Sequence, residues 1–179
     1  MRIRLGLLTL LCLSAVSAFG QNNHELIEMF RADQAARQGE IDWEQVRADD
    51  AERRESVLMI LEAGGIQTAL DYYNAAMIFQ HGDSAEDIRV AHSFASISTA
   101  LDQSSEAARW LKAATWDRLM LNLGQPQWYG TQFVRDEDTG RWKLYDVAPD
   151  IVTDEERKAL AVPTLAESLS RVALMNGEQ

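Results

Sequence analysis

The chain has one cysteine, Cys12, and three prolines among its 179 residues. Cys12 lies in an apolar stretch at the N-terminus, so the remaining chain offers no disulfide and no thiolate for catalysis or metal binding. No apolar run after residue 20 is long enough to cross a bilayer. The fold must therefore be stabilised by packing and hydrogen bonding alone.

Positive charge is also scarce, because 17 Lys and Arg residues stand against 28 Asp and Glu residues, a net charge of -11. Such an acidic surface repels phosphate backbones and anionic lipid headgroups. We therefore expect neither nucleic acid nor a membrane surface as a partner.

Motifs for metal, nucleotide and nucleophile chemistry are missing. The sequence has no His-x-x-x-His, Cys-x-x-Cys, Walker loop or nucleophile elbow. A metal site would need His81, Asp83 and Asp117 to converge, so no metal and no cofactor is predicted. His92 lies among apolar residues of a predicted helix, and we interpret it as a core residue.

Residues 1–20 have the pattern of a secretory signal peptide. Arg2 and Arg4 form the positive end, and Leu5 to Val16 is an apolar core too short to span a membrane. Cleavage is expected before Gln21, with cleavage after Ala18 as the alternative. The pattern predicts a periplasmic or secreted protein.

Cleavage would leave residues 21–179 as a single domain with a net charge of -13, because two basic residues are lost with the leader. Lipid anchoring is not expected, since Cys12 lacks the small residues that precede a lipidated cysteine. No internal repeat, linker or low-complexity segment divides the rest of the chain.

Hydrophobic periodicity and capping residues predict a mainly α domain of about seven helices with one small β-hairpin packed on it. The expected helices cover residues 23–38, 42–63, 66–81, 85–101, 107–123, 154–160 and 165–175, and the hairpin pairs residues 131–135 with 141–147.

The helix over residues 107–123 is central, because its polar stripe is narrow. Arg118 projects from the middle of its apolar face and Asp117 from the border. A buried charge needs a partner, so we expect a carboxylate beside Arg118. In the first helix, Asp33 and Arg37 form either an intrahelical pair or, together with Gln34, a cluster that reaches Arg118 or Asp117.

The segment after the central helix is unusually rich in neutral polar groups. Gly124 and Pro126 end the helix, and the chain is then predicted to be extended from Gln127, with a bulge or close backbone approach at Gly130. This segment forms a nine-residue motif, Gly124-Gln125-Pro126-Gln127-x-Tyr129-Gly130-Thr131-Gln132. Two residue pairs precede it in the chain, Gln80-His81 and Asp117-Arg118.

With these two preceding pairs, the motif resembles a bacterial family catalogued only as a domain of unknown function. The resemblance extends over residues 33–169. It implies one domain and supplies no activity, cofactor or partner, so a function has to be argued from the residues themselves.

We predict a polar site at this helix-to-strand junction. His81, at the end of its helix, serves either to satisfy local carbonyls or as a general base. The predicted catalytic residues are His81, Asp117 and Arg118, and the predicted ligand-binding residues are Gln80, Gln125, Gln127, Tyr129 and Gln132.

The functional hypothesis is a domain that binds a small molecule, a glycan or a peptide, with hydrolysis as an extension. The alternative is a protein-interaction module whose polar cluster is structural and whose Trp128 and Trp142 meet a partner. A concave pocket with unpaired polar groups would favour the first hypothesis, and complete internal pairing would favour the second.

Overall fold

The computed structural model describes residues 20–178, so the predicted signal peptide falls almost entirely outside the described residues. Those residues form seven helices and one antiparallel hairpin, which confirms the predicted mainly α fold class. The elements are α1 (His24–Ala35), α2 (Trp43–Glu62), α3 (Ala69–Gln80), α4 (Ala85–Leu101), α5 (Glu106–Asn122), β1 (Phe133–Arg135), β2 (Trp142–Leu144), α6 (Asp154–Ala159) and α7 (Leu165–Met175).

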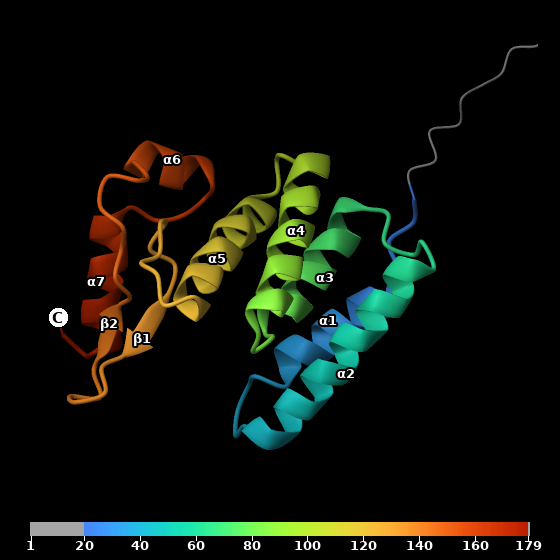
Figure 1. The fold of residues 1–179 in the computed structure, drawn as a ribbon, viewed down its shortest axis with the longest axis horizontal. Helices are drawn as coiled ribbons and strands as arrows, with labels where there is room; N and C mark the ends of the chain where they lie inside the picture. Colours follow the sequence, from blue (N-terminus) through green and yellow to red (C-terminus); the bar gives the residue numbers. More distant parts are fainter. Residues whose placement is uncertain (1–19, 179) are drawn as a thin grey trace, which may run out of the picture.

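Helix α5 lies between two parts of the molecule (Figure 1). On one side, α3 and α4 pack beside it, followed by α1 and α2; on the other side lie the hairpin, α6 and α7. The core of the helical part includes Leu26 of α1, Ile78 of α3 and Leu111 of α5, each with no exposed surface. No helix within residues 20–178 has the length and apolar character needed to cross a membrane.

Capping boxes start four of the helices. Three of them start α4, α6 and α7 at the predicted residues, and α4 and α7 also end as predicted; these boxes are Ser84 with Asp87, Thr153 with Glu156 and Thr164 with Glu167. The fourth box was not predicted: Thr68 accepts from the Asp71 N–H, and Asp71 accepts from the Thr68 N–H. It starts α3 at Ala69, after the predicted residue 66, because the capping side chains, more than the apolar period, determine where the first turn begins.

The hairpin is shorter than predicted. Phe133 pairs with Leu144 and Arg135 with Trp142, and residues 127–132 form no strand beyond an isolated bridge between Gln127 and Val147. The predicted extension from Gln127 is therefore wrong. Its cause is a set of hydrogen bonds that turns the segment around a buried carboxylate of α5.

Candidate functional site

Asp117 holds the loop that follows α5. Its Oδ1 accepts from the backbone N–H groups of Trp128 at 2.8 Å and Tyr129 at 2.9 Å, and its Oδ2 accepts from the N–H and the hydroxyl of Thr131 at 3.0 and 2.8 Å. The residue is completely buried. Burial raises the pKa of Asp117, although the four donors act in the opposite direction. Asp117, predicted as catalytic, thus stabilises the loop.

Gln127 is also completely buried and holds the same loop from within. Its side-chain nitrogen donates to the carbonyls of Gln132 at 3.0 Å and Tyr145 at 2.8 Å, and its side-chain oxygen accepts from the Gln132 N–H at 2.8 Å. No polar atom of Gln127 is accessible to a ligand. The recognition role predicted for this residue has no support in its geometry.

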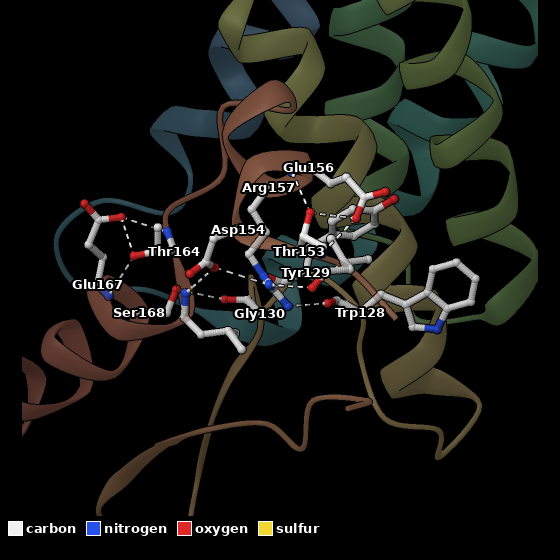
Figure 2. A network of polar contacts seen from close by, with 12 residues as sticks. Trp128, Tyr129, Gly130, Thr153, Asp154, Glu156, Arg157, Thr164, Glu167 and Ser168 are labelled. Carbon is white, nitrogen blue, oxygen red and sulfur yellow. Dashed lines mark hydrogen bonds and ion pairs between the residues drawn. The ribbon is translucent and has the colours of Figure 1, made fainter. Parts of the chain in front are cut away.

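Two residues that no sequence pattern singled out bind the carbonyls of this loop (Figure 2). Arg157 of α6, 3% exposed, donates to the carbonyls of Trp128 and Tyr129, both at 3.0 Å. Ser168 of α7 donates to the Gly130 carbonyl at 3.3 Å. Donors and acceptors of one short loop are thus satisfied by α5, α6 and α7 together.

Gly130 is required where this loop passes α7. Its φ is +84°, and a Cβ there would lie 3.0 Å from Leu165 Cδ2. The close backbone approach predicted for this position is confirmed, because a side chain would meet both backbone strain and a steric contact.

The rigid loop forms one wall of a cavity of about 270 Å³ between α3 and α5. Four of the predicted site residues meet there: Gln80, His81, Arg118 and Gln132. Gln125, which is exposed, and Tyr129, which is half-buried, do not line it. The remaining lining residues are Met77, Trp110, Leu111, Thr131 and Phe133.

Arg118 has no carboxylate partner among residues 20–178, so the predicted ion pair is wrong. Its Nε is buried and has no hydrogen-bond partner in this part of the chain. Burial and, secondarily, the positive charge of Arg37 lower the pKa of Arg118. The nearby carboxylates are already engaged, because Arg37 binds both Asp33 at 3.0 Å and Asp50 at 2.5 Å.

Asp33 instead orients His81. Its Oδ1 lies 2.9 Å from His81 Nδ1, and the same carboxylate accepts from Arg37 and from Gln34. The predicted ion pair between Asp33 and Arg37 is present, but it is not intrahelical, because α1 ends at Ala35 and Arg37 lies beyond it. No ion pair or hydrogen bond joins this cluster to Arg118 or Asp117 among residues 20–178. Because a carboxylate only accepts hydrogen bonds, Nδ1 carries the hydrogen. In the neutral imidazole, Nε2 is then the nitrogen that can accept a hydrogen bond or a proton.

Gln80 contributes an unpaired acceptor to the cavity. The residue is 6% exposed, and its side-chain oxygen is buried without a hydrogen-bond partner among the described residues. Gln132, 7% exposed, uses its side-chain nitrogen on the Ala114 carbonyl at 3.3 Å and on the Thr131 hydroxyl at 3.1 Å. In the part of the chain that the structure describes, Gln80 Oε1 and Arg118 Nε are thus two unpaired polar atoms on residues that line one cavity.

His92 has a structural environment. Its Nδ1 lies 3.1 Å from the Thr115 hydroxyl, and its ring packs on Trp116 with centroids 5.4 Å apart. Burial lowers the pKa of His92. His92 is half-buried, so it lies at the edge of the core that the sequence suggested for it, and these contacts give it a structural role. Within residues 20–178, no three or more His, Cys, Asp or Glu side chains are grouped as metal ligands.

Comparison of the chain with protein-family models, curated proteins and solved structures finds no match.

Proposed function

We propose that this chain is a small-molecule-binding domain whose ligand places a carboxylate or similar anionic group on Arg118 in the cavity between α3 and α5. The observation that carries the proposal is half-buried Arg118, whose Nε is buried without a hydrogen-bond partner and which has no carboxylate partner in residues 20–178. A polar group that is buried without a hydrogen-bond partner is costly, and a ligand anion bound to Arg118 would offset that cost. Among small molecules, glycans and peptides, this favours those that carry an acid group.

The neighbouring groups support an oriented ligand. Gln80 offers a carbonyl oxygen to a ligand N–H or O–H, and His81 offers Nε2, held in place through Asp33. Ligand sites generally combine a mostly apolar wall with a few such polar groups. Met77, Leu111 and other lining residues supply the apolar wall.

The interaction-module alternative has less support. Gln127 and Gln132 are paired internally, as that hypothesis requires. However, Trp128 is half-buried against Trp116, with ring centroids 4.7 Å apart, and Trp142 is half-buried with Arg135 over its ring. Both indoles thus pack on the protein's own side chains, whereas Arg118 Nε and Gln80 Oε1 have no hydrogen-bond partner among the described residues.

The first test is Arg118→Met, which keeps the side chain's packing and removes its charge. We expect the variant to lose at least about 30-fold in affinity for organic acids, because removing one partner of a buried charge contact costs about 2 kcal/mol or more. We also expect the free energy of unfolding to rise by about 1 kcal/mol, since a buried group without a partner is removed.

The measurements are a thermal-shift screen of organic acids against their neutral amides, calorimetric titration of the hits, and urea denaturation. Arg89→Met is the matched control, because Arg89 of α4 has a side chain 52% exposed and, within residues 20–178, pairs only with Glu86. Equal acid affinity in Arg118→Met and the parent would refute the assigned anion site. A stability loss above about 1 kcal/mol would show that Arg118 is paired in solution.

Hydrolysis is the second candidate function, favoured by the Asp33 to His81 hydrogen bond of 2.9 Å. A carboxylate that orients an imidazole is the arrangement of a general base. A water molecule would add to the ester carbonyl carbon while its proton passes to Nε2, and the imidazolium would return that proton to the departing alkoxide. Arg118 would hold an acid group elsewhere on the same substrate.

Half-esters of dicarboxylic acids test this second candidate. We expect the protein to hydrolyse them faster than buffer alone, as measured by acid release in a pH-stat. The rate should fall at least about 100-fold in His81→Phe, because a general base contributes 10²- to 10⁴-fold. His24→Phe is the control, since His24 is exposed at the start of α1. If the parent protein showed no hydrolysis, the second candidate function would be refuted and only the binding function would remain.

A further inference from the structure

A second and larger hollow lies beside the Arg118 cavity. Its volume is about 520 Å³, and it is formed by α5, the Gly130 loop and the segment from α6 to α7. Its lining is largely apolar, with charged side chains at Lys158, Glu167 and Arg171; the other lining residues are Trp110, Gly130, Thr131, Phe133, Ala161, Val162, Pro163 and Ser168.

The two hollows share Trp110, Thr131 and Phe133. Thr131 is fixed, because its N–H and hydroxyl both bind Asp117. Phe133 lies under the guanidinium of Arg171, 5.4 Å from the ring centroid. Trp110 is 38% exposed, so an aromatic surface open to solvent connects the polar cavity to the apolar one.

Charge around the larger hollow is positive in an otherwise acidic protein. Glu167 is used as the cap of α7, where its carboxylate accepts from the N–H and hydroxyl of Thr164 at 2.7 and 2.8 Å. Lys158 and Arg171 have no carboxylate within 4 Å among residues 20–178. Together with Arg118, they attract an anion to a groove that has few other charges.

We infer that the two hollows form one groove for an amphiphilic organic carboxylate, whose acid group binds Arg118 and whose apolar chain passes Trp110 and Phe133 into the larger hollow. This inference rests on the proposed acid site and adds the ligand's class. The polar cavity accepts the acid, and the larger hollow gives a long apolar chain a place away from water.

The test is calorimetric titration of the protein with butanoate, hexanoate and octanoate. Burial of each added methylene group should lower Kd about fourfold. In parallel, octanoate should change the intrinsic fluorescence of the protein, and Trp110→Phe should remove most of that change, since Trp110 is the one tryptophan that lines both hollows.

Pro163→Asp separates the inference from the proposed function. Pro163 is exposed and lines only the larger hollow, so a carboxylate there should weaken octanoate binding at least about tenfold and leave butanoate unchanged. Pro149→Asp is the matched control, because Pro149 is exposed and lines neither hollow.

The possible failures are distinguishable. If butanoate and octanoate had equal Kd values and neither acid bound to Arg118→Met, the apolar groove would be overturned and the acid site kept. Octanoate binding that survives Arg118→Met would overturn the acid site. Absence of binding by the whole series would overturn both.

Discussion

Asp117→Ala should lower the free energy of unfolding by about 4 kcal/mol, the largest single effect that we expect in this protein. The substitution leaves the N–H groups of Trp128, Tyr129 and Thr131 without their acceptor. A buried donor without a partner costs about 1 to 3 kcal/mol, and partial entry of water offsets part of the total.

Urea denaturation measures this loss, and two further variants identify its cause. Thr131→Val removes one of the four contacts to Asp117 and should cost about 1 kcal/mol. Asp117→Asn keeps the size but points an amide N–H toward backbone donors, so it should resemble Asp117→Ala more than the parent. If Asp117→Ala stayed within about 1 kcal/mol of the parent, the loop would not depend on this carboxylate.

Gln127→Ala should lower the free energy of unfolding by about 3 kcal/mol. It removes the partner of the Gln132 N–H and of the carbonyls of Gln132 and Tyr145, all close to a completely buried side chain. Each buried group left unsatisfied contributes about 1 kcal/mol or more. This outcome is the opposite of what a ligand-binding glutamine would give.

Gln125→Ala provides a matched control in the same loop. Gln125 is exposed, so its loss should change stability by less than about 0.5 kcal/mol, as for ordinary surface substitutions. Thermal denaturation of both variants measures the difference directly. Equal effects of the two substitutions would mean that the buried hydrogen bonds of Gln127 do not stabilise the loop.

The helices were predictable because their signals are local. Ser84 with Asp87 marks the start of α4, and Thr164 with Glu167 marks that of α7, within four residues of sequence. The loop over residues 127–132 was not predictable, because its conformation depends on Asp117, which lies ten or more residues earlier in the chain, and on groups of α6 and α7. Alternating side chains alone suggested a strand there.

The candidate site was only partly predictable for the same reason. The apolar face of α5 made Arg118 conspicuous, and the end of α3 made His81 conspicuous, but the hydrogen-bond partner of His81 comes from a distant segment. Asp33 is 48 residues from His81, and Arg37 rather than Arg118 binds Asp50. Four of the predicted site residues line one cavity, but the sequence does not reveal which cation receives the available carboxylates.

Titration of the protein with octanoate, followed through the arginine Nε–H resonances by NMR, tests the central claim most directly. The Arg118 resonance can be assigned by its absence from Arg118→Met. We expect that resonance to shift progressively and to saturate with the Kd measured by calorimetry, while the resonance of exposed Arg89 stays in place. An unchanged Arg118 resonance at saturating octanoate would contradict the claim that Arg118 receives the ligand's acid group.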